Sequence, residues 1–190
     1  MNPIIYLIIF SAFFVLFGFF LLLLLVLIID STIRGHDLPT SRRATKSIVK
    51  IISEHKTAKN FYDLGCARGA LAVRLKKRFP ALTAHAIDND PIRIFFAKIR
   101  AKLFRREVHF WRKDIFDADL SDADIVYTYL WYDLMPPLEK KLQRELKQGA
   151  IVITNTSNFP TWQPTQKIIT CPKISKTPDF ETLFVYQKNA

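Results

Sequence analysis

The chain opens with a long apolar stretch and continues as short apolar runs separated by polar turns. Residues 1–29 contain no charged side chain, and residues 4–29 are apolar almost without interruption. A helix of this length spans about 39 Å, more than the roughly 30 Å hydrocarbon core of a bilayer. A cleavable signal peptide would need a basic start, a shorter apolar core and a small-residue cleavage site, and the sequence shows none of these. We therefore predict a transmembrane anchor over residues 1–30.

The charges on either side of this span predict its orientation. No basic residue precedes the span, whereas several follow it within residues 31–57, a basic linker that ends in a helix reaching about Glu54. These basic residues are Arg34, Arg42, Arg43, Lys46 and Lys50. Because basic loops stay on the cytoplasmic side, we expect a single-pass protein of the inner, cytoplasmic membrane, with the rest of the chain in the cytoplasm and the bilayer as a partner.

Residues 58–190 alternate apolar runs typical of strands with amphipathic segments typical of helices. The predicted strands cover residues 60–64, 82–87, 107–111, 124–130 and 149–154, with two closing antiparallel strands at 166–170 and 182–186. The predicted helices cover residues 70–79, 91–104 and 137–147. Alternation with short links indicates an α/β fold, an open Rossmann-like sheet of seven strands with helices on both faces.

Two acids follow the first two strands at a spacing that suggests a nucleoside cofactor. The first strand runs into the loop Asp63-Leu64-Gly65-Cys66-Ala67-Arg68-Gly69, whose glycines tolerate positive φ and leave the backbone bare. The second strand ends at Asp88, followed by Asn89, where a carboxylate typically binds ribose hydroxyls. The loop lacks the G-x-G-x-x-G spacing of dinucleotide-binding proteins.

The loop resembles the D-x-G-x-G-x-G motif of the class I, seven-strand methyltransferases that use S-adenosylmethionine (SAM). The resemblance implies that Asp63, Gly65 and Gly69 hold the methionine end and that Asp88 holds the ribose. It also implies that Asp114 contacts adenine, with Asp117 and Asp119 as weaker candidates for that contact. Ala67 stands where the family usually has glycine, which leaves a non-catalytic copy of the fold as an alternative. The cofactor-binding candidates are Asp63, Gly65, Cys66, Ala67, Gly69, Asp88, Asn89 and Asp114.

A narrower resemblance comes from sequence blocks in the second half. These blocks are residues 119–121, 135–142, 145–150 and 159–164, together with Leu38-Pro39-Thr40-Ser41 near the start of the domain. Their order is similar to that of the lysine methyltransferases that modify the ATP synthase c-subunit and the adenine nucleotide translocase. This resemblance implies protein-lysine N-methylation, with a membrane protein as the substrate.

Methyl transfer from a sulfonium requires alignment and a dry site more than a nucleophilic side chain. Aromatic rings and a carboxylate suit an acceptor that arrives as an ammonium ion and reacts as an amine. Trp131, Tyr132 and Asp133 follow the fourth strand and are the catalytic candidates. Packing of the two aromatic rings over the sheet is the alternative role. We expect no metal, because the four histidines show no ligand spacing.

The charge balance raises further alternatives. The chain carries 28 Lys and Arg against 17 Asp and Glu, a formal charge of +11. A basic helix at residues 91–104 could meet nucleic acid, acidic protein or membrane, or could simply be solvated. We do not expect a nucleic-acid partner, because the fourth strand lacks the N/D-P-P-Y segment of amino-adenine methyltransferases. A lipid headgroup or small lipophilic amine is the second candidate acceptor. Nothing in the sequence indicates an oligomeric state.

Overall fold

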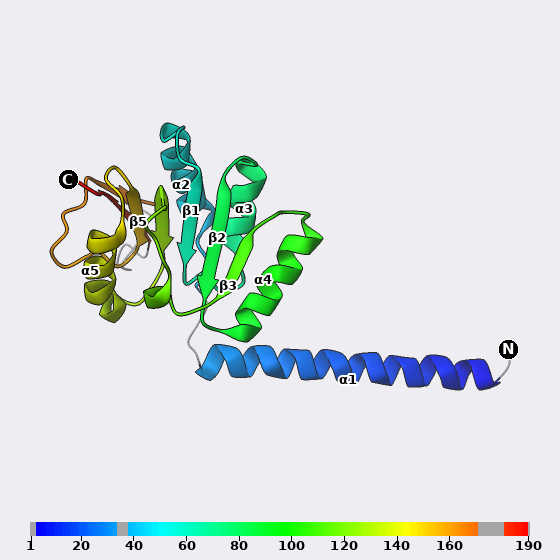
Figure 1. The fold of residues 1–190 in the computed structure, drawn as a ribbon. Coiled ribbons are helices and arrows are strands. Elements are labelled where there is room, and N and C mark those ends of the chain that lie inside the picture. Colours follow the sequence, from blue (N-terminus) through cyan, green and yellow to red (C-terminus); the bar gives the residue numbers. More distant parts are fainter. Residues whose placement is uncertain (1–2, 34–37, 171–180, 190) are drawn as a thin grey trace. The chain divides into compact units, whose positions relative to one another are not determined.

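The computed structural model describes residues 3–33, 38–170 and 181–189, which form two compact units, Met1–Leu38 and Pro39–Ala190 (Figure 1). The first unit contains one helix, α1 (Pro3–Ile33). Within it, Pro3–Ile28 is long and apolar enough to cross a membrane, and its apolar side chains are exposed on all sides of the helix. Arg34, the first residue of the predicted basic flank, lies outside the described residues.

The second unit is built on one seven-stranded sheet with the order β3-β2-β1-β4-β5-β7-β6. Its strands are β1 (Asn60–Leu64), β2 (Thr83–Asp88), β3 (His109–Arg112), β4 (Ile125–Thr128), β5 (Ile151–Asn155), β6 (Gln166–Ile169) and β7 (Thr182–Gln187). The first five strands pair in parallel, and β7 lies antiparallel between β5 and β6. The predicted seven-strand α/β sheet, with its closing antiparallel pair, is confirmed.

Helices cover both faces of this sheet, as predicted. They are α2 (Arg42–Glu54), α3 (Ala70–Arg78), α4 (Pro91–Leu103) and α5 (Met135–Glu145), with two short 3₁₀ turns, η1 (Ile115–Asp117) and η2 (Tyr132–Leu134). Ile48 of α2 and Leu75 of α3 share a core cluster with Phe61 of β1, whereas Leu138 of α5 packs with Leu64, which points to the opposite face. Figure 1 shows α5 on the other side of the sheet from α3 and α4.

Side-chain caps explain where two of the helices begin. Ser41 accepts a hydrogen bond from the amide of Ala44 at the start of α2, at 3.0 Å. Asp90 accepts from the amides of Ile92 and Arg93 at the start of α4, with Pro91 at the first helical position. A short polar side chain at the N-cap accepts hydrogen bonds from the amides that a helix N-terminus leaves free. Proline suits the first helical position, where no amide is needed. Both N-termini agree with the sequence pattern.

The region after β4 differs from the sequence prediction. The predicted strand extends to residue 130, but β4 ends at Thr128, where its neighbours β1 and β5 also end their pairing. The chain then turns through η2 into α5, which begins at Met135, two residues before the predicted start. Pro136 and Pro137 fit the first turn of α5, because a helix leaves its first amides unbonded.

Candidate functional site

The loop between β1 and α3 adopts a conformation that requires small residues. Gly65 and Gly69 have φ values of +77° and +66°, in the left-handed region that favours glycine. A Cβ atom on Gly65 would lie 2.6 Å from Leu130 Cδ2, and one on Gly69 would lie 2.7 Å from Phe110 Cε1. Both glycines are therefore required by their backbone conformation and by the space around them.

Ala67 lies between these glycines and shares their unusual backbone conformation. Its φ is +48°, which costs a residue with a Cβ about 1–2 kcal/mol relative to a right-handed conformation. The amide of Ala67 donates a hydrogen bond to Asp88 Oδ2 at 2.9 Å. This bond to a buried carboxylate helps to hold Ala67 in the conformation that glycine would adopt more readily.

Hydrogen bonds fasten the loop after β1 to the end of β2. The amides of Gly65 and Cys66 both donate to the carbonyl oxygen of Ile87, at 2.9 and 3.0 Å. Asp88 Oδ1 accepts from the amide of Asp90 at 3.0 Å, so the carboxylate of Asp88 bonds to both loops. The carboxyl ends of β1 and β2 are thus joined by backbone hydrogen bonds, with the buried carboxyl groups of Asp63 and Asp88 beneath them.

Two of these carboxyl groups have raised pKa values because they are buried. Burial raises the pKa of Asp63 to about 7, and the charge of nearby Asp88 adds to the shift. Burial also raises the pKa of Asp88, although the amides of Asp90 and Ala67 and the charge of Arg93 act in the opposite direction. Two buried carboxyl groups close together favour a ligand that brings positive charge or hydroxyl donors.

The other predicted cofactor residues lie at the same edge of the sheet but differ in exposure. Cys66 is buried and packs with Ala72, so its side chain belongs to the core. Asn89 is exposed directly after β2. Asp114 is exposed two residues after β3 and accepts a hydrogen bond from the amide of Phe116 at 2.9 Å, which starts η1.

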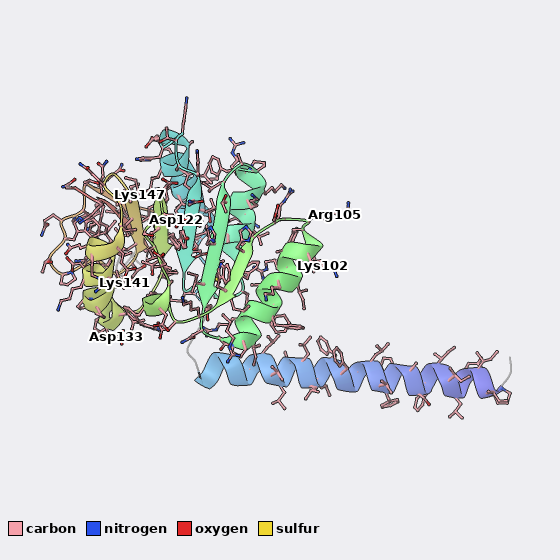
Figure 2. All side chains as sticks on the ribbon, viewed as in Figure 1. Lys102, Arg105, Asp122, Asp133, Lys141 and Lys147 are labelled. Atoms are coloured by element: carbon pink, nitrogen blue, oxygen red, sulfur yellow. The ribbon has the colours of Figure 1, made fainter. Side chains whose placement is uncertain are left out.

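The three catalytic candidates lie on the surface after β4. Trp131 and Tyr132 are 62% and 78% exposed, and Asp133 is also exposed. The preceding residue, Leu130, lies directly against Gly65, so the Trp131–Asp133 segment continues from the edge of the glycine loop. In Figure 2, Asp133 lies at the opposite end of the sheet from Asp122, which precedes β4.

A buried polar network near this edge was not predicted from the sequence. The hydroxyl groups of Tyr127 and Thr40 share a hydrogen bond of 2.7 Å. Asn155, at the end of β5, donates to Tyr127 Oη at 3.2 Å and to Glu181 Oε1 at 3.0 Å, and the same Glu181 oxygen accepts from the amide of Ser41 at 3.0 Å. Of its members only Asn155 ends an apolar run, and that pattern is too common to identify a network.

The strand order, with a glycine loop after β1 and an acid after β2, defines the class I SAM-dependent methyltransferase fold. Solved structures with this fold include an RNA methyltransferase from Salinibacter ruber in complex with S-adenosyl-L-homocysteine (TM-score 0.70, 22% identity), with 80% of this chain and 94% of that chain covered. Magnesium protoporphyrin IX methyltransferase from Synechocystis, with bound SAM, matches at a TM-score of 0.62 and 10% identity, over 77% of this chain and 79% of that one.

The family is defined more narrowly by sequence. Residues 63–166 match the family model for the ANTKMT methyltransferase domain, and the chain belongs to this family. The protein is thus a SAM-dependent methyltransferase.

Similar proteins include a protein-lysine N-methyltransferase from Saccharolobus islandicus, 25% identical over 69% of this chain and 82% of that protein. The ATP synthase C-subunit lysine N-methyltransferase of Rattus norvegicus is 29% identical over 67% of this chain, which spans 58% of the rat protein. The adenine nucleotide translocase lysine N-methyltransferase of Mus musculus is 40% identical over a shorter stretch, 30% of this chain and 25% of that protein.

Proposed function

We propose that the chain is a membrane-anchored protein-lysine N-methyltransferase whose acceptor is a lysine of a membrane protein. The observation that carries the proposal is the family match over residues 63–166, which includes both the glycine loop and the Trp131–Asp133 segment. The relatives named above methylate lysine side chains according to their names. The acceptor amine then meets the cofactor at the carboxyl ends of β1 and β4, where ligands of open α/β sheets bind.

The two carboxyl groups at the ends of β1 and β2, those of Asp63 and Asp88, fit SAM, which carries positive charge and two ribose hydroxyl groups. Asp88 accepts one amide bond on each carboxylate oxygen and keeps further lone pairs for hydroxyl donors. Buried Asp63 favours the positively charged methionine end, and the bare backbone at Gly65 and Gly69 allows close approach. Asn89 and Asp114 would border the adenosine side.

The exposed segment that leads from Trp131 into η2 would receive the acceptor. When bound, SAM would supply an electrophilic methyl group on a sulfonium, and transfer of that group to a neutral amine would leave S-adenosylhomocysteine, a neutral thioether. The rings of Trp131 and Tyr132 attract the incoming ammonium group by cation–π interaction. Asp133 then accepts a hydrogen bond from lysine Nζ and orients it. Nζ loses its proton to water before transfer, while the acceptor lies at exposed Asp133 and has not yet reached the methyl group.

The membrane part of the proposal is supported by the length and composition of α1 and by the basic residues that follow it. With α1 across the bilayer, the positive-inside rule puts residues 39–190 on the cytoplasmic side, where SAM is made. Resistance of the full chain to extraction by alkaline carbonate tests the anchor. Release into the soluble fraction would contradict it.

Transfer of a labelled methyl group tests the activity. Full-length protein and SAM labelled in its methyl group are incubated with membranes from cells that lack the protein. We expect label in a protein band, recovered as methyl-lysine after hydrolysis, and abolished by Asp88→Ala.

Variants and the chemical form of the label separate the alternatives. Asp133→Ala should lower transfer about 100-fold while leaving SAM binding unchanged, whereas Glu107→Ala, at an exposed acid before β3, should have no effect. Label that partitions into an organic extract would instead assign a lipid or small amine as acceptor. Absence of label, with no SAM binding by calorimetry, would overturn the proposal.

A further inference from the structure

Helix α4 carries a group of large apolar side chains on its exposed side. Phe95, Ile99, Leu103 and Phe104 are 60%, 38%, 75% and 62% exposed. They are four of the nine exposed large hydrophobic residues described between positions 38 and 189, and all four belong to one helix and its C-cap. Such clustering on one element marks an interaction surface, whereas single exposed apolar residues are ordinary.

Three of these side chains lie together because of helical geometry, and Phe104 follows them as the C-cap residue. Phe95, Ile99 and Leu103 are spaced by four residues, so they occupy an arc of about 80° on the outer side of α4. Ile94, Ala97 and Ala101 are buried and occupy the inner side of the same helix. The apolar arc is therefore additional to the residues that pack α4 onto the domain.

Basic residues border the arc on both sides, and residues 91–106 contain no acid. Lys98 and Lys102, both exposed, fall on one side of it, and half-buried Arg100 falls on the other, by the same spacing. Arg93 is only 16% exposed and pairs with the capping carboxylate of Asp90 at 3.9 Å, so it is not part of this border. Arg105 follows directly after the helix, and Figure 2 shows Lys102 and Arg105 at the end of α4 that lies farther from Asp133.

We propose that this outer surface of α4, formed by Phe95, Ile99, Leu103 and Phe104 with the lysines and arginines around them, rests in the headgroup region of an anionic bilayer. An amphipathic helix with a bulky apolar face and a basic polar border is the form that lies in a membrane interface. The lysine and arginine stems reach past the apolar arc and leave their charges at the level of the phosphates. The inference rests on the proposed membrane location and adds a lipid contact outside α1.

Other occupants of the surface fit the same residues less well. Nucleic acid would satisfy the basic residues but leave the leucine and phenylalanine side chains exposed to water. A second copy of the chain would cover the apolar arc but would bring two strongly basic helices face to face, which is unfavourable. A bilayer that contains anionic lipid satisfies both parts of the surface at once.

Photocrosslinking in lipid nanodiscs tests the proposal with the full chain. A benzophenone amino acid is placed at position 95 or 103, and at Arg144, an exposed position on α5, as the matched control. In nanodiscs of phosphatidylcholine and phosphatidylglycerol we expect lipid adducts at positions 95 and 103 to exceed those at 144 by on the order of tenfold. Equal yields at the three positions, or crosslinks to a second copy or another protein, would overturn the proposal.

Two further measurements separate this contact from the anchor. A fourth probe at Phe13 reports on α1: adducts at position 13 without adducts at 95 and 103 would remove the α4 contact and leave the proposed anchor. Adducts at 95 and 103 without any at 13 would support the α4 contact and contradict the proposed anchor. The pair Lys98→Glu and Lys102→Glu should lower the α4 adduct yield on the order of tenfold, whereas Lys77→Glu with Arg78→Glu, an equal change of charge on α3, should not.

Discussion

The carboxylate of Asp88 at the end of β2 accepts a hydrogen bond from the main-chain amide of Ala67, 21 residues earlier in the loop after β1. Its other oxygen accepts from the amide of Asp90 at the start of α4. One side chain thus holds two of the loops that border the proposed cofactor site. Its contribution to binding and its contribution to the shape of the loops are inseparable in the folded protein.

Removal of this carboxylate should therefore affect binding and stability together. Asp88→Ala leaves two amides without their acceptor, and we expect a loss of about 1–3 kcal/mol in the free energy of unfolding. SAM affinity, measured by calorimetry, should fall at least about tenfold. Asp124→Ala is the control, because Asp124 also accepts hydrogen bonds from two amides, those of Lys59 and Asn60 at 2.8 Å, but lies before β4 at the amino end of the sheet. Equal SAM affinity in the two variants would contradict the role of Asp88.

The backbone of Ala67 predicts a stabilising substitution. Ala67 has a φ of +48°, so Ala67→Gly removes the steric cost of a Cβ in this conformation. Glycine also adds some entropy to the unfolded chain, and we expect a net gain of about 1 kcal/mol in the free energy of unfolding. Thermal unfolding should show a higher midpoint, with SAM affinity unchanged or improved. The same replacement at buried Ala118, whose φ is −73°, should destabilise the protein. A gain at position 118 as large as that at 67 would refute the explanation.

Substitution of two glycines by alanine distinguishes the cost of a positive φ from the cost of a crowded Cβ. Gly69 and Gly149 both have positive φ, but a Cβ would meet Phe110 and Ala97 at Gly69 and nothing within 4 Å at Gly149. Gly149→Ala should cost about 1 kcal/mol, and Gly69→Ala should cost a further 1–3 kcal/mol or so because of overpacking. Chemical denaturation of both variants measures the difference. Equal losses would show that contact with Phe110 does not matter.

The raised pKa of Asp63 predicts that stability falls as the pH rises. The folded protein keeps the proton up to about pH 7, whereas the unfolded chain releases it near the usual value of 3.8. Between these values the folded state binds more protons, so the free energy of unfolding decreases with pH, by at most about 1.4 kcal/mol per unit, and levels off above pH 7. Stability due to this group is thus fully present below pH 3.8.

Asp63→Asn should reduce this slope, because an amide does not titrate. We expect the variant to be more stable than the parent at pH 8 when both are unfolded by urea without cofactor, and the difference to shrink steadily as the pH falls toward 3.8. The slope should not vanish entirely, since burial also raises the pKa of Asp88. Parallel curves for the two proteins across this range would show that Asp63 titrates normally.

The local features of the site were predictable because they depend on short stretches of chain. Asp90 followed by Pro91 identifies a helix start, and Gly65 and Gly69 mark positions where positive φ is required. The end of β4 was harder to predict, because the aromatic run from Tyr127 to Tyr132 is typical of a longer strand. There the strand stops at Thr128, the last residue that pairs with both β1 and β5, and this pairing is a property of the sheet and not of the local sequence.

The contacts made across long sequence separations were not predictable. Ser41 and Glu181 are 140 residues apart, and no periodicity or motif relates them, yet they share a hydrogen bond. The positive φ of Ala67 was also beyond the sequence pattern, since alanine normally indicates a right-handed conformation. The departure from glycine at this position was visible, but its consequence for the backbone was not.

The position of β7 between β5 and β6 has a consequence for the order of events during synthesis. Strands β5 (residues 151–155) and β6 (166–169) leave the ribosome before β7 (182–187). Both of them pair with β7 and not with each other, so neither pairing can form until β7 has emerged. Until then β5 keeps one open edge, and β6 has no partner at all among the described strands. Long-range pairing of this kind is slow and leaves strand edges exposed to wrong partners. The sheet is therefore completed only after residues 182–187 have been translated, long after the apolar residues of α1 have emerged.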